Sequence, residues 1–207
     1  MINPLSYSPK GDKKNSDYFN AYRIKIYERR IKSGLSELIG NIQALVIQVQ
    51  TGDAFQYLKE LYLMMPYRYD KSYISDTHRI YILKNTKKSP ALVLLEPLDP
   101  CFTDDITRVN RMYPNARDKY NARYVGEIFQ CSNLKETVHI LKSHDFNFQD
   151  ASSVQNRFYA NDKLIFTRMS DHTFNSTGYT EHSLLDSEAF EFGQPFSLTK
   201  AQIAELK

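Results

Sequence analysis

Three side chains in the last third of the chain have types that bind metal ions. His172 precedes the turn-forming segment 175–178 (NSTG), and Glu181 and His182 follow it. A hairpin closed by this segment brings His172 across from the other two. Two imidazoles and a carboxylate suit Fe(II), Mn(II) or Zn(II), with Glu181 as the candidate catalytic residue. Because strand neighbours face opposite sides, only one of Glu181 and His182 can share the side of His172, and exposed hairpin residues remain the alternative.

A second group of residues could hold an organic ligand. Tyrosine and arginine are concentrated between residues 67 and 79, where the spacing predicts a loop over 67–77. Such side chains stack on aromatic rings and bind anionic groups. The alternative is that the tyrosines pack over the rim of the core. The candidate ligand-binding residues are Tyr67, Arg68, Tyr69, Tyr73 and Arg79.

The N-terminal segment is basic and has helical periodicity. Residues 1–40 carry eight Lys or Arg and four Asp or Glu, and the rest of the chain is close to neutral. Ser16 or Asp17 can cap a helix that runs to about Leu38. A nucleic-acid or protein-interaction role for this basic helix is the alternative function, although no nucleic-acid-binding motif is present and nucleic acid is therefore not the expected partner. The predicted apolar stripe consists of Phe19, Tyr22, Ile26, Ile31, Leu35 and Leu38.

The remaining sequence shows the same order of elements twice. Apolar β-branched runs predict strands, and Asp53 and Asn133 each begin a helix with Gln56 or Glu136 three residues later, which is the capping-box spacing. The caps lie eighty residues apart, as an internal duplication would place them. Predicted strands cover 42–50, 78–83, 91–95, 123–131, 155–160, 163–169 and 179–185, and predicted helices cover 53–65, 133–143 and 200–206.

This order predicts an α+β fold of two βαβββ-like modules with curved mixed sheets, plus an N-terminal helix. The modules span residues 41–98 and 122–185. An N-terminal arm and basic amphipathic helix (1–40), a linker (99–121) and an acidic C-terminal tail (186–207) complete the chain.

Composition excludes several classes of protein. The chain of 207 residues is 42% hydrophobic and 25% charged, which is typical of a globular domain and not of a disordered one. It contains only seven glycines, and neither of the phosphate-binding motifs G-x-G-x-x-G and G-x-x-x-x-G-K-S/T occurs in it. Nucleotide binding therefore has no support from a sequence motif. We expect no signal peptide, no membrane association and a cytoplasmic location, with Cys101 and Cys131 as reduced thiols.

The repeated strand–helix–strands pattern resembles the vicinal oxygen chelate superfamily, which includes glyoxalase I, bleomycin-resistance proteins and extradiol dioxygenases. The similarity lies in 41–49 followed by 53–61, in 91–97 (ALVLLEP) and in 123–141. It implies paired modules whose sheets form a cup for a small molecule. It also implies a divalent metal held on the first and last strands of each module, where lyase or dioxygenase chemistry takes place.

This chain departs from that metal pattern. Gln43 falls near the first ligand position, but Val93 stands where many members have glutamate, and Gly126 falls at the equivalent position of the second module. Glu96 lies three residues beyond Val93, and we expect it outside the cup. His172 and one of Glu181 and His182 would supply two metal ligands, and a third could come from His78 or Gln43. The expected function is therefore small-molecule binding in the cup, with a metal-dependent reaction and a homodimer as open possibilities.

Overall fold

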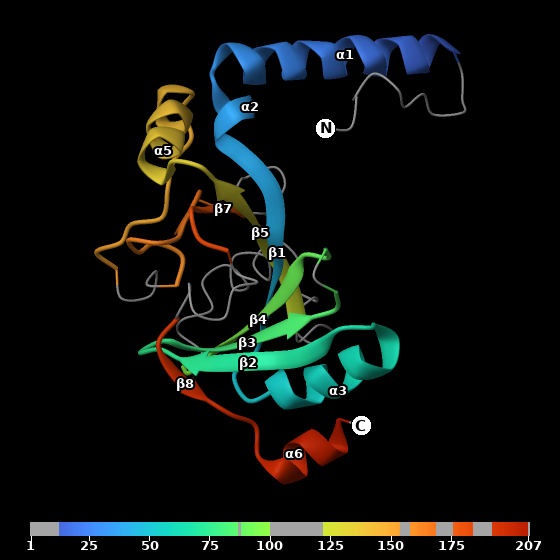
Figure 1. The fold of residues 1–207 in the computed structure, drawn as a ribbon, viewed down its shortest axis with the longest axis vertical. Coiled ribbons are helices and arrows are strands. Elements are labelled where there is room, and N and C mark those ends of the chain that lie inside the picture. Colours follow the sequence, from blue (N-terminus) through green and yellow to red (C-terminus); the bar gives the residue numbers. More distant parts are fainter. Residues whose placement is uncertain are drawn as a thin grey trace, which may run out of the picture.

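The computed structural model describes residues 13–86, 88–99, 122–153, 158–168, 176–183 and 192–206. The first module is a complete βαβββ unit, in which a strand and a helix are followed by three more strands (Figure 1). The sequence predicted this order of elements, except for β2. The elements are β1 (Ile39–Val49), α3 (Ala54–Met64), β2 (Arg68–Ile74), β3 (His78–Lys84) and β4 (Ala91–Pro97).

The second module repeats the first strand, the helix and the final strand of that pattern. β5 (Ala122–Cys131) leads into α5 (Leu134–Ser143), and β6 (Ile165–Phe166) and β7 (Ser176–Thr180) follow. In each module the first strand pairs in parallel with the last strand described, β1 with β4 and β5 with β7. The equivalent pairing supports the internal repeat that the two helix caps indicate.

A single eight-stranded mixed sheet joins the two modules. Its order is β6-β7-β5-β1-β4-β3-β2-β8, and β1 and β5, the first strands of the modules, pair antiparallel at its centre. At the far edge β8 (Gln194–Phe196) pairs with β2, and α6 (Lys200–Glu205) follows it. The fold is therefore the predicted α+β arrangement of βαβββ modules with a curved mixed sheet and an N-terminal helix.

The two faces of the sheet bury different sets of side chains. In the first module, Leu83, Leu92 and Leu94 pack against Leu58 and Leu61 of α3. The alternate strand positions face the other way, because side chains of a strand point to opposite faces in turn. We call that side of the sheet the inner face, and its core residues come from both modules, among them Ala44, Val46, Ile82, Val93 and Ile128.

The N-terminal helix differs from the prediction at both ends. α1 (Lys13–Lys32) begins before the expected caps Ser16 and Asp17, and it ends before Gly34. Gly34 has a φ of 79°, a left-handed conformation that interrupts a helix. A separate single turn, α2 (Leu35–Leu38), then leads into β1. The predicted continuous helix over 16–38 is therefore wrong.

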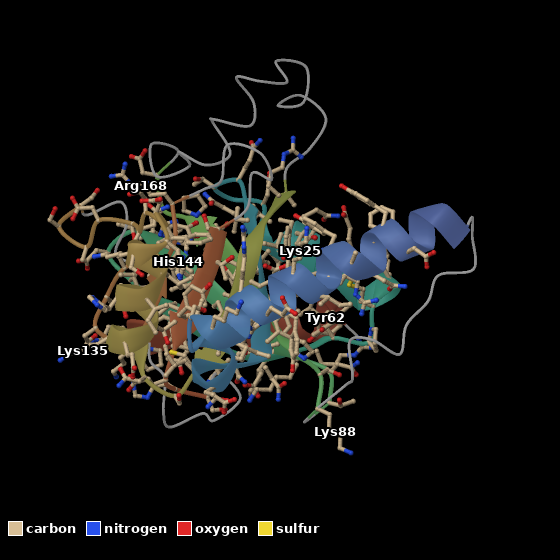
Figure 2. All side chains as sticks on the ribbon, turned by 90° about the horizontal axis from the view of Figure 1, so that it is seen from above. Lys25, Tyr62, Lys88, Lys135, His144 and Arg168 are labelled. Atoms are coloured by element: carbon tan, nitrogen blue, oxygen red, sulfur yellow. The ribbon has the colours of Figure 1, made fainter. Side chains whose placement is uncertain are left out.

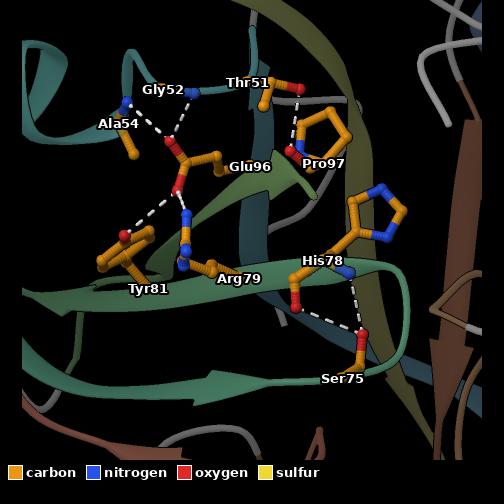
Figure 3. A network of polar contacts seen from close by, with 9 residues as sticks. All are labelled: Thr51, Gly52, Ala54, Ser75, His78, Arg79, Tyr81, Glu96 and Pro97. Atoms are coloured by element: carbon orange, nitrogen blue, oxygen red, sulfur yellow. Dashed lines mark hydrogen bonds and ion pairs between the residues drawn. The ribbon is translucent and has the colours of Figure 1, made fainter. Parts of the chain in front are cut away.

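The start of α3 is stabilised by a different residue from the one predicted. Asp53 occupies the N-cap position, but its side chain makes no capping hydrogen bond. Instead, Oε1 of Glu96 accepts hydrogen bonds from the backbone N–H groups of Gly52 (2.9 Å) and Ala54 (3.3 Å), as Figure 3 shows. A carboxylate on a neighbouring strand thus supplies the acceptors that the first helical turn needs.

Two segments predicted as turns or loops are strands. Residues 68–74, expected within a loop, form β2 because they pair on one side with β3 and on the other with β8. The segment 175–178 was expected to close a hairpin, but Ser176 to Gly178 belong to β7. A Cβ on Gly178 would come within 2.7 Å of the Phe166 ring, so this glycine permits close packing of a side chain against the strand.

Other local predictions are confirmed. The side chain of Asn133 accepts a hydrogen bond from the Glu136 N–H at the start of α5. The helix predicted over 200–206 is α6, and it begins with a capping box of Thr199 and Gln202 that was not predicted. The predicted strands over 155–160, 163–169 and 179–185 lie partly outside the described residues, as does most of the linker 99–121. Over the part of the chain that is described, no helix has the length and apolar character needed to cross a membrane.

Candidate ligand-binding cleft

The inner face of the central strands carries small or apolar side chains. On β1 and β4 these are Ala44, Val46 and Val93, which are fully buried. On β5, Gly126 has no side chain, and a Cβ there would lie 1.8 Å from the carbonyl oxygen of Ser176 on β7. The close approach of β5 and β7 therefore requires glycine at this position, and the floor of the inner face offers few polar atoms.

Aromatic side chains of the chain itself pack over this floor. Phe158 stacks on Phe192 with ring centroids 5.2 Å apart, and it meets Tyr159 edge-on at 5.1 Å. Tyr159 in turn meets Phe166 edge-on at 5.4 Å. Edge-on and offset contacts of this kind are favourable for aromatic rings. The space between the modules is consequently filled, over the described residues, by a layer of rings.

A few polar groups are buried within this aromatic layer. The Tyr159 hydroxyl donates to Oε1 of Gln48 on β1 at 3.0 Å. His78 on β3 is fully buried, its ring meets Tyr159 edge-on, and its Nδ1 lies 2.8 Å from Oγ1 of Thr77. Burial lowers the pKa of His78 to about 4, because desolvation disfavours the imidazolium. His78 is therefore neutral at physiological pH.

Three buried polar atoms on the central strands have no hydrogen-bond partner among the described residues. They are Oε1 of Gln43, Nε2 of Gln48 and Oγ of Ser176. Each residue is more than nine-tenths buried. Buried polar atoms normally have a partner, so water or a ligand could serve at these positions.

A cleft of about 690 Å³ opens at one end of the aromatic layer. Its larger apolar lining residues include Ile80, Phe158 and Phe192, and its charged lining residues are Asp76, Asp162 and Lys163. The cleft joins the two modules, since β2, β3 and the turn between them form one side and residues 158–163 form the other. The remaining lining residues are Ile74, Ser75, Ala151, Ala160, Asn161, Gly193 and Gln194.

The predicted tyrosine and arginine site is divided between the two faces of the sheet. Tyr73 lies in the inner core beside Phe192, with ring centroids 6.1 Å apart. Tyr67 and Tyr69 pack instead against the core beneath α3, and Arg68 lies over the Tyr62 ring.

Arg79, the fifth member of that set, is bound on the α3 side. Its guanidinium contacts Oε2 of Glu96 at 3.2 Å, and the Tyr81 hydroxyl donates to the same oxygen at 3.3 Å (Figure 3). Burial and the Glu96 charge raise the pKa of Tyr81 well above its usual range. Glu96 thus lies outside the cup, as expected, and the five predicted residues do not converge on one cavity.

The predicted metal ligands are also separated. Gln43 hydrogen-bonds Gln130 near the start of β1 (3.2 Å), whereas His78 pairs with Pro97 at the far end of β4. Since Gln48 aligns with Leu95 of β4, the two residues are seven strand positions, or roughly 23 Å, apart along the strand direction. His172 lies outside the described residues.

Glu181 and His182 lie together at the N-terminus of α5. A carboxylate oxygen of Glu181 accepts a hydrogen bond from the Leu134 N–H, which makes it a cap of that helix. Both residues line a smaller hollow of about 390 Å³ with Lys135 and Lys163. Over the described part of the chain, no three His, Cys, Asp or Glu side chains are grouped as a metal site requires.

The described residues therefore do not fit the metal that the fold family implies. The amide pair Gln43–Gln130 stands apart from His78, and no group of three metal-binding side chains forms among the described residues. Sequence reasoning missed the residues that form the cleft, because nothing in the local pattern around Phe158, Asp162 or Phe192 indicates that they meet.

Comparisons with known proteins agree with the architecture. No protein-family model matches the sequence, and neither does any curated protein. Among solved structures, methylmalonyl-CoA epimerase from Mycobacterium tuberculosis is 15% identical, with a TM-score of 0.50 over 70% of this chain and 89% of its own. A methylmalonyl-CoA epimerase in complex with methylmalonyl-CoA is 12% identical over 72% and 99% of the two chains, with a TM-score of 0.49.

A variant of 4-hydroxymandelate synthase from Streptomyces coelicolor is also similar, with 11% identity over 69% of this chain and 47% of its own and a TM-score of 0.45. At these identities the similarity is one of fold. The match to the Mycobacterium epimerase shows that this chain shares its fold with that structure.

Proposed function

We propose that this protein binds a small organic molecule in the cleft between the β2–β3 turn and residues 158–163. The observation that carries the proposal is the cleft itself, about 690 Å³ in volume, at the junction of the two modules. Ligand sites in proteins commonly have volumes of about 300 to 1,000 Å³ and lie between structural units. Its lining combines apolar side chains with polar and charged ones, and ligand sites typically pair apolar contact surface with polar groups that orient the ligand.

The lining favours a ligand with a flat apolar body and a polar edge. The exposed edges of Phe158, Phe192 and Ile80, which are 3%, 9% and 1% exposed, form the apolar floor on which a small aromatic or alicyclic ring would lie. Asp162 and Lys163 at the rim would contact hydrogen-bonding or charged groups of the ligand. The proposal is restricted to binding, because the described residues support no resident metal.

Saturation-transfer NMR with two matched probes tests this proposal. Tyramine and 4-hydroxyphenylacetate share a phenol ring but carry opposite charges, so their comparison also shows which rim charge dominates. We expect ring-proton saturation from at least one probe with the wild-type protein. The variant Ala151→Trp, which places an indole on an exposed wall of the cleft, should abolish it, whereas Ala21→Trp on α1 should not.

Two results would contradict the proposal. One is the absence of saturation with both probes, and the other is equal saturation in Ala151→Trp and the wild type. Metal analysis of the purified protein provides a separate check on the chemistry. If the purified protein contains stoichiometric iron, manganese or zinc, and the variant His172→Ala loses it, the proposal of ligand binding without catalysis is wrong. A metal-dependent lyase or dioxygenase function would then take its place.

A further inference from the structure

α1 exposes a row of large apolar side chains to solvent. Tyr18 is 69% exposed, Phe19 and Tyr22 are each 55% exposed, and Ile26 is 49% exposed. At 3.6 residues per turn these four side chains fall within roughly 100° of the helix circumference. We call them the aromatic face of α1. α1 projects past the rest of the molecule (Figure 1), and Tyr18, Phe19 and Tyr22 belong to its N-terminal half.

No residue of α1 belongs to the buried clusters formed by the described residues. A single helix of 20 residues has little stability in water without tertiary contacts. A helix that exposes four large apolar side chains is stabilised when a further surface covers them.

Positive charge borders the aromatic face on both sides. On a helical projection Lys25 and Lys32 lie along one edge, Arg23 and Arg30 lie along the other, and Arg29 continues the face toward the C-terminal end. Figure 2 shows Lys25 on the helix above the sheet.

The two acidic residues of the helix, Asp17 and Glu28, project to the opposite side. Over its whole length α1 contains seven Lys or Arg and these two acids. The charge of the helix therefore favours a negatively charged partner on the side of the aromatic face.

We propose that the aromatic face of α1 binds the surface of a membrane that contains anionic lipids. The rings of Tyr18, Phe19 and Tyr22 suit the boundary between headgroups and acyl chains, where tyrosine and phenylalanine are favoured. The flanking cations lie at the height of the lipid phosphates, and long Lys and Arg side chains can reach them while their stems cover apolar surface. The helix lies on the membrane and does not cross it.

Two other partners fit the same face less well. If the aromatic faces of two copies of α1 packed together, the five Lys and Arg residues around one face would meet the same five of the other. The repulsion between these like charges opposes such a dimer. A nucleic acid would attract the cations, but its phosphates and base edges offer no apolar phase for Phe19 and Ile26. The membrane proposal does not depend on the cleft, and either proposal can fail without the other.

Vesicle flotation of the full-length protein tests the proposal directly. The probes are phosphatidylcholine vesicles with roughly 30% phosphatidylglycerol and pure phosphatidylcholine vesicles, each at about 0.1 M salt. We expect the protein to float with the anionic vesicles, with at least about tenfold weaker partitioning to the neutral ones. Raising the salt should release it, because surface charge interactions are screened.

Matched double variants separate the aromatic face from the helix as a whole. Phe19→Ser with Ile26→Ser should reduce partitioning by roughly tenfold or more, because two apolar side chains no longer enter the membrane. Ile24→Ser with Ile31→Ser removes similar side chains from the other side of α1, where they are 39% and 50% exposed, and should leave partitioning within about twofold.

A second matched pair tests the contribution of charge. Lys25→Glu with Arg29→Glu should reduce partitioning by more than about tenfold. The same change in net charge on α5, Lys135→Glu with Lys142→Glu, should have a much smaller effect because those residues lie away from the aromatic face.

The proposal is overturned by no flotation with anionic vesicles, by equal flotation with neutral ones, or by equal losses from the two serine double variants. It is also overturned if a labelled single-stranded or duplex oligonucleotide binds at about 0.1 M salt while the vesicles do not.

Discussion

Acidification should destabilise this protein through one buried histidine. His78 lies on the inner side of β3 with none of its surface exposed, and its ring packs against Tyr159 and Phe158. Burial lowers the pKa of its imidazole from an ordinary value of 6.5 to about 4. In the unfolded chain the same group is solvated and has its ordinary pKa.

The sign of the effect follows from proton binding. Between pH 6.5 and about 4 the unfolded state binds a proton at His78 and the folded state does not, so the free energy of unfolding falls as the pH falls. The contribution is fully present above pH 6.5 and is lost as the pH drops to about 4. Two and a half pKa units correspond to about 3 kcal/mol in total, of which about 2 kcal/mol is lost between pH 7 and pH 5.

Urea denaturation at pH 7 and pH 5 measures this loss. The variant His78→Gln removes the titrating group but keeps a polar side chain beside Thr77, so its unfolding free energy should change by about 2 kcal/mol less than that of the wild type over the same interval. His139→Gln on the exposed side of α5 is the matched control and should retain the wild-type dependence. An identical pH dependence in His78→Gln and the wild type would refute the reasoning.

Three other substitutions test the fold around the site, each by urea denaturation. Glu96→Ala should lower the free energy of unfolding by about 2 to 3 kcal/mol, since it removes the acceptor for the start of α3 and for Arg79; Glu96→Gln should lose less. Gly126→Ala should prevent β5 and β7 from pairing, because its Cβ would overlap the Ser176 carbonyl, and a soluble variant of wild-type stability would contradict that packing. Glu181→Ala should cost about 1 kcal/mol as a lost helix cap, and unchanged stability would contradict this capping role.

Local features of this fold can be predicted from the sequence because they depend on a few neighbouring residues. The cap Asn133, a strand that begins at Ala91 and the end of α3 before Pro66 all follow from side-chain chemistry within a few residues. The strand–helix order that recurs eighty residues apart also gives the module architecture, although Asp53, unlike Asn133, makes no capping hydrogen bond.

The faces of the strands could not be predicted in the same way. Register shifts interrupt the pairing of β1 with β5 on both sides of Ile42 and again after Val46, and another interrupts β2 after Tyr69. Each shift changes which side chains share a face, since the side-chain period of a strand is two. For this reason the predicted tyrosine and arginine site separates into one residue on the inner face and others beneath α3.

The candidate site depends on contacts between distant segments. Gln48 accepts a hydrogen bond from Tyr159, and the ring of Phe158 stacks on that of Phe192, although the residues of each pair lie far apart in the sequence. Glu96 caps a helix that begins more than forty residues before it. The amino-acid sequence by itself determined most of the elements, their repeated order and the presence of a basic N-terminal helix, because propensities, caps and charge act locally. It did not determine β2, β7 or the bounds of that helix, which depend on strand pairing and on the conformation of Gly34. Only the tertiary structure decided that aromatic rings fill the inner face and that a cleft opens beside them, because long-range strand pairing sets which side chains converge.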